Sequence, residues 1–560
     1  MNKLTGNIKL AALTAIFSAA SAWAQSGNIS NDLQQAISPK FGMSTFSSGA
    51  GTDGASPSAA LIDVIIQYKS APTSTQYQQV ANLGGTLKTQ YGAVYAAHYG
   101  LPKSAVQTLA TDPNVIYMSL DRPVKGMLDI TAAAVHSNVA NQNGYDGSGI
   151  GVAVIDSGIA NLPDFNGWRG SRVIYNQTYV GNSAADQFGH GTHVAGILGA
   201  NGWNAKYKGI APNVNLVNFR VLDQNGAGTD SSVIAAIDQA VQLSYSWRYN
   251  VRVINLSLGR PVFEPAALDP LCQAVERAWK AGIVVVVAAG NYGRDNSAGE
   301  NGYATINSPA NDPYVITVGA MKTLGTATRT DDLIASYSSK GPTLFDHYVK
   351  PDLVAPGNMI VSTLPSGMTL ATQYPKNAVS SVYFALSGTS MAAPVVSGAA
   401  ALLLQQNPDL SPDQVKARLM ETATKNFPTS SVAYDSVTKV AYTSYYDTFT
   451  VGAGYLDITA ALSSTDLAPG PALSPDVTFN LTNHTLSVSN VAGSNAIWGS
   501  NAIWGSNAIW GSNVIWGSNA IWGSNVIWGS NVIWGSNAIW GSSVILGSST
   551  PTPDFSGGEQ

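Results

Sequence analysis

Apolar, β-branched runs alternate with amphipathic segments between about residues 129 and 462. Strands of a parallel sheet that is buried on both faces are rich in Val and Ile, as are the five runs GIGVAVIDSGI, VNLVNFRVLD, VRVINLSLG, GIVVVVAAGN and YVITVGA. The helix period fits the segments GTHVAGILGA, SSVIAAIDQAVQL and LDPLCQAVERAWKAG. This alternation predicts an α/β domain with a doubly wound, mostly parallel sheet and right-handed crossovers. Sites in such sheets gather beyond the carboxyl ends of the strands.

A second, smaller pattern occupies residues 60–125. Strand-like LIDVIIQYK is followed by helix-like STQYQQVANLGG, and TLKTQYGAVYAAHYGLP indicates two strands around Gly92. KSAVQTLATDP is helix-like and ends at a proline, and VIYMSL is a last strand. The order β-α-β-β-α-β predicts a small α+β domain of the split-βαβ type.

The N-terminal residues have the pattern of a secretory signal peptide. Lys3 and Lys9 precede the apolar run LAALTAIFSAASA, and the small-residue motif Ala-Trp-Ala ends at Ala24. We interpret residues 1–24 as this signal. A helical anchor is the alternative, which the shortness of the run disfavours. The Ser/Gly/Ala-rich residues that follow, 25–58, predict a linker.

The C-terminal residues are repetitive. A linker is predicted at 463–492, after which the unit GSN[AV]IW recurs eight times and a ninth, degenerate copy ends the repeats at 493–546, before a short tail, 547–560. A period of six places every Trp on one face of a strand but on three faces of a helix, so short strands in a stacked array are favoured. The alternative is a low-complexity tail without a fixed fold. A row of Trp side chains would suit a cell-surface or carbohydrate partner.

Composition narrows the function classes. With 28 basic and 33 acidic residues the net charge is -5, which provides no basic field for nucleic acid. The single cysteine, Cys272, cannot form an internal disulfide. Its helix-like segment predicts a small core side chain, and a nucleophilic thiol is the alternative.

Candidate chemistry centres on a hydroxyl surrounded by small residues. Ser390 lies in LSGTSMAAPVVSGAAALLL, where a polar loop leads into an apolar helix. A serine needs a base to remove its proton, usually a histidine oriented by a carboxylate. His190, in DQFGHGTHVAGILGA, is expected at an exposed helix start, and its flanking glycines are expected to admit substrate backbone. Asp156 ends the strand in GVAVIDSGI, at the expected sheet edge.

Other interpretations of these residues remain open at this point. His190 and His193 form an H-x-x-H pair that could bind a metal, although no Glu accompanies them as a general base. Asp156 could serve only an Asx turn at a strand end. A different serine hydrolase, such as an esterase, would carry a G-x-S-x-G elbow, which the chain lacks around Ser390. The order Asp, His, Ser matches one of the known catalytic triad orders.

The motifs VIDSGI, GHGTHVAGI and SGTSMAAP resemble the three catalytic motifs of the subtilases, the subtilisin-like serine peptidases. The resemblance covers about 129–462 and includes INLSLG and VVVVAAGN. It implies that Asp156 orients the imidazole, His190 is general base and then acid, and Ser390 is the nucleophile. His193 matches the family's second, non-catalytic histidine.

The same resemblance assigns the surroundings of the nucleophile. Asn291 would donate to the oxyanion, with the backbone N–H of Ser390 at a helix start, and Pro394 is expected in the first turn of that helix. The strand that pairs with extended substrate would include Gly226, Ala227 and Gly228. The pocket for the residue before the cut would have small or apolar walls, which predicts a preference for large apolar side chains: Ser257, Leu258, Gly259, Ala288, Ala289 and Gly290.

The domain at 60–125 resembles the inhibitor I9-type propeptide of subtilases. We therefore expect a propeptide at 25–127, cut autocatalytically from a peptidase domain at 128–462 between Arg122 and Asp129. No cofactor is required for the chemistry. Calcium commonly stabilises the family, but no loop is acidic enough to name ligands, and no metal site is assigned.

The sequence thus predicts a secreted serine endopeptidase, extracellular or on the cell surface, that is made as a zymogen and acts on proteins or peptides. A surface-binding or adhesive protein that acts through the Trp repeats is the alternative.

Overall fold

The computed structural model describes residues 28–37, 61–92, 94–121, 123–126, 137–203, 207–296, 301–324, 326, 329, 331–435, 440–480 and 485–489. The expected signal peptide, the Trp repeats and the expected junction after residue 127 lie outside the described residues. Within the described ranges, no helix combines the length and the apolar character needed to cross a bilayer.

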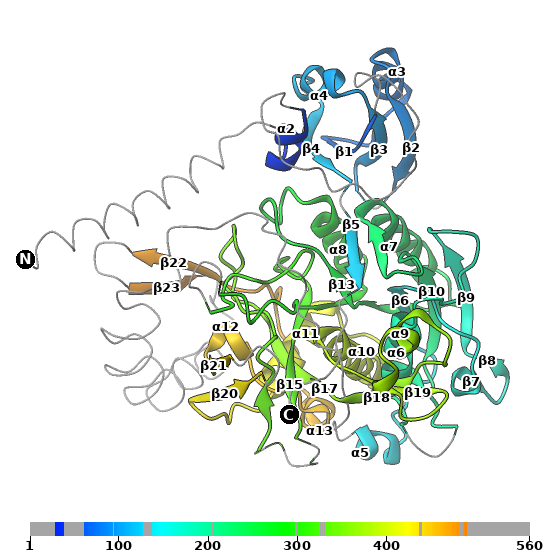
Figure 1. Cartoon of the computed structure of the whole chain (residues 1–560), viewed down its shortest axis with the longest axis vertical. Coiled ribbons are helices and arrows are strands. Elements are labelled where there is room, and N and C mark those ends of the chain that lie inside the picture. The colour runs from blue at the N-terminus through cyan, green and yellow to red at the C-terminus, as the bar shows by residue number, and fades with distance from the viewer. Residues whose placement is uncertain are drawn as a thin grey trace, which may run out of the picture.

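The small domain lies at the top of Figure 1 and has its own core. Its elements follow the order that the sequence predicted: β1 (Ile62–Tyr68), α3 (Ser74–Asn82), β2 (Thr86–Tyr91), β3 (Ala96–Leu101), α4 (Lys103–Ala110) and β4 (Val115–Leu120). The strands form an antiparallel sheet in the order β2-β3-β1-β4. Helix α2 (Asn31–Ile37) packs on this domain through the buried Leu33.

The large domain is built on one central sheet in the order β16-β15-β14-β12-β6-β10-β9, with β17 also paired to β15. Every pairing is parallel except β15 with β16. The expectation of a mostly parallel sheet is therefore confirmed. The strands are β6 (Gly151–Asp156), β9 (Val173–Thr178), β10 (Asn215–Arg220), β12 (Val251–Leu256), β14 (Val284–Ala288), β15 (Ile316–Lys322), β16 (Leu333–Ile334) and β17 (Leu353–Asn358).

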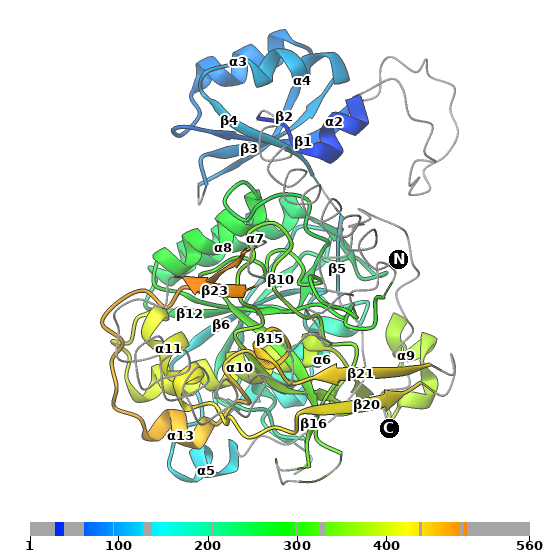
Figure 2. The ribbon, with the colours of Figure 1, turned by 90° about the vertical axis from the view of Figure 1, so that its left-hand side faces the viewer.

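Helices cover both faces of this sheet (Figure 2). The predicted helices appear as α6 (His190–Gly199), α7 (Asp230–Ser244) and α8 (Pro270–Lys280), and the apolar run after Ser390 forms α10 (Thr389–Gln406). Helices α7 and α8 pack together on one face, and α6 and α10 pack together on the other. Thr229 caps α7 by accepting the N–H of Ser232, and Asp269 caps α8 by accepting that of Leu271.

Smaller elements complete the described chain. They are α5 (Ser137–Gln142), β7 (Asn166–Gly167), β8 (Gly170–Ser171), β18 (Ile360–Thr363), α9 (Thr369–Gln373), β19 (Tyr383–Leu386), α11 (Pro412–Thr422), β20 (Ser430–Tyr434), β21 (Ala441–Tyr445), α12 (Thr448–Val451), α13 (Ile458–Ser463), β22 (Asp476–Asn480) and β23 (Thr485–Ser489), with 3-10 turns at Pro163–Phe165 and Pro375–Asn377.

The strand order changes direction at β6. β9 and β10, which follow β6 in the chain, lie on one side of it in the sheet, and the later strands β12 and β14 lie on the other side. The carboxyl ends of β6 and β12 therefore flank a topological switch point, where ligands bind in open α/β sheets.

One short strand connects the two domains. β5 (Pro123–Gly126) follows the small domain and lies between β11 (Ala227–Thr229) and β13 (Leu258–Gly259), which both belong to the large domain. Both pairings are antiparallel. Figure 1 shows β5 running from the small domain onto the large one, beside α7.

Part of the expected linker packs against the large domain through a buried ionic cluster. Asp352 lies 2.7 Å from Lys350 and 3.0 Å from Lys416, and Ser474 donates to it at 2.6 Å. All four are buried. Burial lowers the pKa of Lys350 to about 8. Although burial alone would raise the pKa of Asp352, the two ammonium groups hold it below its usual value.

We expect Asp352→Asn to cost about 3–5 kcal/mol of stability, because it leaves two buried ammonium groups without their carboxylate. The measurement is thermal unfolding of a Ser390→Ala chain, which removes the expected self-digestion. Glu276→Gln is the control, because it breaks the pair with Lys280, whose ammonium group is exposed, and should cost less than about 1 kcal/mol. Equal midpoints for the two variants would contradict the expected role of the cluster.

Candidate active site

A buried hydrogen bond joins Asp156 to His190. Asp156 is the last residue of β6 and His190 is the first residue of α6. The imidazole Nδ1 lies 2.8 Å from Oδ1 and 3.0 Å from Oδ2 of the carboxylate. A carboxylate can only accept, so Nδ1 carries the proton and Nε2 is the basic nitrogen. The expectation that His190 is exposed is wrong, since both side chains are fully buried.

The glycine after His190 serves packing. A Cβ on Gly191 would lie 2.3 Å from the carbonyl oxygen of Gly158 and 3.1 Å from Cβ of Asp156. Any larger residue would push the first turn of α6 away from the end of β6. Gly191 therefore allows the close approach that the Asp156–His190 hydrogen bond needs, and it contacts the protein's own backbone where substrate backbone was expected.

Asp186 holds the same turn from the other side, and sequence reasoning missed it. Its Oδ1 accepts from the N–H groups of Phe188 (3.0 Å) and Gly189 (2.8 Å), and its Oδ2 accepts the N–H of Thr192 at 2.9 Å. Ser157 Oγ donates to the carboxylate at 2.9 Å. Burial raises the pKa of the Asp186 carboxyl, and these donors oppose that effect. The sequence signal that could have identified Asp186 is an acidic residue just before a helix start.

Ser390 is the second residue of α10, where a backbone N–H has no acceptor within the helix. Its Oγ donates to the carbonyl oxygen of Ser257 at 3.2 Å, and Ser257 Oγ donates to the carbonyl oxygen of Ser390 at 2.8 Å. Helices α10 and α6, which carry Ser390 and His190 in their first turns, pack against each other.

Pro394 has a different place from the one expected. It lies inside α10, beyond the first turn. A proline has no N–H, so the carbonyl four residues earlier, that of Ser390, loses its helical donor. Ser257 Oγ supplies the replacement, and Asn255 Nδ2 in turn donates to Ser257 Oγ at 3.0 Å.

Asn291 faces the start of α10. Its Oδ1 accepts the backbone N–H of Thr389 at 3.0 Å and the Thr389 hydroxyl at 3.1 Å. A backbone N–H can only donate, so the oxygen of the amide must be on this side. Thr389 Oγ1 also accepts the N–H of Gly290 at 3.1 Å. The amide is thus fixed with its NH₂ group on the side away from Thr389.

His193 and Cys272 are core residues. His193 Nε2 donates to the carbonyl of Phe384 at 3.0 Å, and burial lowers the pKa of His193 to about 3. It is therefore neutral and bonded to the backbone, which argues against a metal shared with His190. Burial raises the pKa of the Cys272 thiol well above its usual value, as for an inert cysteine. Among the described residues, no group of three or more His, Cys, Asp or Glu side chains could hold a metal ion.

The expected substrate-binding residues surround β5. Ala227 pairs with Lys125, and Gly228 pairs with Val124. On the other side, Gly259 also pairs with Lys125, and Leu258 pairs with Gly126. Gly226 directly precedes β11, and Ser257 directly precedes β13.

The second expected wall of the pocket begins where β14 ends. Ala288 and Ala289 are fully buried. Asn307 adds a polar group here that sequence reasoning missed: its N–H donates to the carbonyl of Ala289 at 3.0 Å, and its Cγ lies 3.2 Å from where a Cβ on Gly290 would be.

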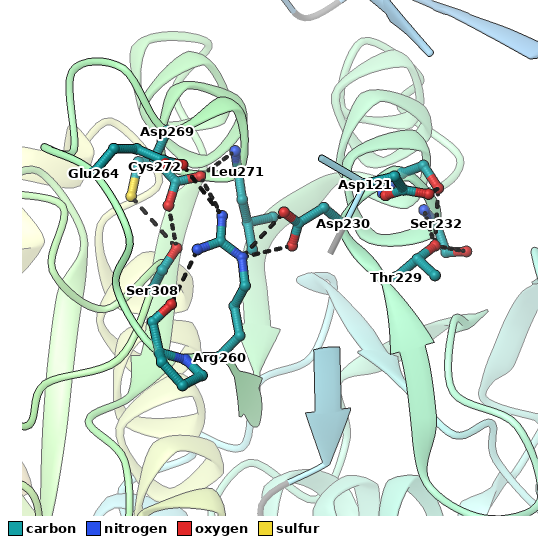
Figure 3. Close-up of polar contacts among 12 residues, drawn as sticks. Asp121, Thr229, Asp230, Ser232, Arg260, Glu264, Asp269, Leu271, Cys272 and Ser308 are labelled. Carbon is teal, nitrogen blue, oxygen red and sulfur yellow. Dashed lines mark hydrogen bonds and ion pairs between the residues drawn. The ribbon is translucent and has the colours of Figure 1, made fainter. Parts of the chain in front are cut away.

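A buried ion pair joins the two strands that flank β5 (Figure 3). Asp230 follows β11 and Arg260 follows β13, and Arg260 Nε lies 2.9 Å from Asp230 Oδ1. Arg260 Nη2 lies 2.8 Å from Asp269, the cap of α8. Since one guanidinium holds both carboxylates, the spacing of the two strands is fixed by charge as well as by packing.

Comparison with known proteins agrees with this architecture. The model of the Subtilase family matches residues 147–439. Serine protease AprX from Bacillus subtilis (strain 168) is 36% identical over 379 residues, which cover 64% of this chain and 82% of that protein. Subtilisin E from the same organism is 37% identical over 368 residues, which cover 64% of this chain and 83% of subtilisin E.

Among solved structures, fervidolysin from Fervidobacterium pennivorans, a keratinolytic enzyme related to subtilisin, shares the fold. The TM-score is 0.53 at 21% sequence identity, and the match covers 72% of this chain and 61% of fervidolysin. With the fold, the family match over more than half of the chain and relatives covered over most of their length, the chain belongs to the subtilase family and is a subtilisin-like serine endopeptidase.

Proposed function

We propose that Asp156, His190 and Ser390 form the catalytic triad of an endopeptidase that is made as a zymogen and releases its own propeptide. The observation that carries this proposal is the position of β5. A peptide segment of the chain is paired on both sides in a cleft, in the way that β-augmentation would bind a substrate, and it leads toward Ser257 and Ser390.

The chemistry follows from the buried hydrogen bond. Asp156 holds the proton on Nδ1 of His190, so Nε2 takes the proton of Ser390 as Oγ attacks the carbonyl carbon. The tetrahedral intermediate expels the amine, which receives that proton from His190. Water then attacks the acyl-enzyme with His190 again as base, and Ser390 is regenerated.

Asn291 and the N–H of Ser390 are the proposed oxyanion donors. Thr389 holds the oxygen of the Asn291 amide, which leaves its NH₂ group to donate. The N-terminus of α10 adds a favourable dipole for the developing charge. The donors are fixed before the reaction, so they cost no reorganisation when the charge forms.

The small domain is proposed as the inhibitory propeptide. Its Asp121 accepts the N–H of Ser231 at 2.7 Å and the Ser231 hydroxyl at 2.5 Å, near the start of α7. Gln67 Nε2 donates to the carbonyl of Leu268 at 2.7 Å. These contacts hold the domain over the large one, while β5 occupies the cleft. Figure 3 places Asp121 beside Thr229 and Ser232.

The end of β5 supports a junction close to the nucleophile. Gly126, the last residue of β5, pairs with Leu258, and the carbonyl of the preceding Ser257 accepts the hydroxyl of Ser390. We therefore place the cut between Met127 and Leu128. Met127 is itself a large apolar residue, which accords with the proposed preference for such a residue before the cut.

Two proposals concern features beyond the described residues. Residues 1–24 are proposed to direct secretion, and the Trp repeats at 493–546 are proposed to bind a cell-surface or carbohydrate partner. Structural calcium is proposed by analogy with the family, without assigned ligands.

The first prediction concerns self-cleavage. The Ser390→Ala chain, expressed alone, should keep its propeptide because no acyl-enzyme can form, whereas the unaltered chain should begin at Leu128. Intact mass and N-terminal sequencing would show both. Ser244→Ala, at the end of α7, is the matched control and should mature normally. Maturation of the Ser390→Ala chain would rule out self-cleavage, and a different N-terminus would correct the proposed junction.

The second prediction concerns the oxyanion. Asn291→Ala should lower kcat roughly 10²–10³-fold with little change in KM, the magnitude established for the corresponding donor in subtilisin. Asn291→Asp is the sharper variant, because it keeps the acceptor for Thr389 and replaces the donor with a carboxylate oxygen, whose charge also opposes the oxyanion. Asn201→Ala, whose amide bonds a distant loop, is the control. An Asp variant with unchanged kcat would exclude the role.

The third prediction concerns the residue before the cut. Peptides that differ only there should be cleaved faster with Met, Leu or Phe than with Lys or Asp, because the small and apolar walls offer no partner for a charge. Initial rates at low substrate concentration give kcat/KM for each peptide. A preference for Arg or Lys would overturn the assignment of this pocket.

A further inference from the structure

We propose that the buried ammonium group of Lys416 fills a binding site for a monovalent cation, so that the chain itself supplies the ion that this site would take. The site, which we call the oxygen cage, consists of the carbonyl oxygens of Pro313, Tyr314 and Val315, Oδ1 of Asp352 and Oγ of Ser474. The inference concerns how the expected linker is attached to the large domain, and it does not depend on the proposed function.

Three successive carbonyl groups of the backbone converge on one atom. Nζ of Lys416 lies 2.9 Å from the carbonyl oxygen of Pro313, 3.2 Å from that of Tyr314 and 3.0 Å from that of Val315. The chain bends at these three residues, and Asp312 Oδ1 accepts the N–H of Tyr314 at 2.9 Å, as in an Asx turn. Consecutive carbonyl oxygens that face one point can replace the hydration shell of a cation.

Two side chains complete the oxygen cage around Lys416. Asp352 Oδ1 lies 3.0 Å from Nζ, and Ser474 Oγ lies 3.1 Å from it. The Ser474 hydroxyl donates to Asp352 at 2.6 Å, so its lone pairs are left to accept from the ammonium group. An ammonium group has three protons, and the cage offers more oxygens than that. The oxygen dipoles therefore surround Nζ as they would surround a spherical ion.

The size and the charge of the oxygen cage both suit a monovalent cation. The distances from Nζ to its oxygens exceed the about 2.3–2.6 Å of calcium–oxygen bonds. Lys350 Nζ lies 2.7 Å from Oδ2 of Asp352 and 3.0 Å from the carbonyl oxygen of Val315. A divalent ion in the cage would therefore place two positive charges beside the Lys350 ammonium group. An ammonium or potassium ion, which have nearly the same radius, would add only one.

The oxygen cage joins four segments of the chain. Lys416 lies on α11, Val315 directly precedes β15, Asp352 directly precedes β17, and Ser474 belongs to the expected linker. A metal ion at such a junction would leave when its concentration in the surroundings fell. The ammonium group of Lys416 is covalently attached, so its local concentration does not depend on the solution. We therefore expect this junction to hold in solutions that are poor in metal ions.

The test removes the ammonium group and offers a free cation in its place. Lys416→Ala, in the full chain with Ser390→Ala, should unfold at a lower temperature than its parent. Ammonium or potassium chloride at about 0.5 M should raise its unfolding midpoint by about 2–4 °C relative to lithium or tetramethylammonium chloride, because a bound ion stabilises only the folded state. The parent should show less than about 1 °C of difference between these salts.

Two matched variants separate cation binding from general effects of salt and of cavities. Lys416→Met keeps the length of the side chain and fills the cage with an apolar group, so its midpoint should be the same in all four salts. Val415→Ala also shortens a fully buried side chain of α11, but it leaves the cage occupied by Lys416. It should lower the midpoint equally in every salt.

A crystal structure gives a direct measurement. Crystals of the Lys416→Ala chain grown with rubidium chloride should show anomalous scattering between the oxygens of the cage, where Nζ lies in the unaltered chain. If the variant folds only with ammonium or potassium present, the same dependence supports the proposal. An equal midpoint in all four salts, the same salt preference in Lys416→Met, or failure of Lys416→Ala to fold in any salt would overturn it.

Discussion

The hydrogen bond between Asp156 and His190 is the contact on which the rest of the site depends. It joins the end of a central strand to the start of a helix, in an environment without exposed surface. Burial makes the bond strong and also makes its loss costly, because an unpaired carboxylate there would have no solvent to stabilise it. Gly191 lets the two backbones approach, and Asp186 ties the intervening loop to the helix start. The imidazole is therefore held in one orientation and one tautomer.

The start of α10, which carries Ser390, depends on side-chain hydrogen bonds that replace a missing helical one. Pro394 removes the helical donor of the Ser390 carbonyl, and Ser257 takes its place while its own carbonyl accepts the Ser390 hydroxyl. Asn291 holds the first residue of the helix through Thr389. The residues that follow β12 and β14 are thereby bonded to the start of the helix that carries Ser390.

The cleft is formed by backbone pairing, which reads no side chains by itself. β11 and β13 both pair with β5 through their backbones, and the Arg260–Asp230 pair fixes their separation. The strand that lies between β11 and β13 belongs to the chain itself, because β5 follows the small domain.

The sequence by itself determined the strands and their parallel arrangement. It also named, as candidates, the residues of the triad, Asn291 and the strands that flank β5. A continuous apolar run such as that of β14 indicates a strand that is buried on both faces. Motifs as long as those around Asp156, His190 and Ser390 are specific enough to indicate the family of the chain. The sequence did not reveal the contacts of Asp186, Arg260 and Asn307, nor the burial of His190 and the true place of Pro394. Periodicity reports which face of a segment is buried, but not which groups meet there. Those contacts join segments far apart in the chain, and only the packing of helices, loops and strands against each other decided them.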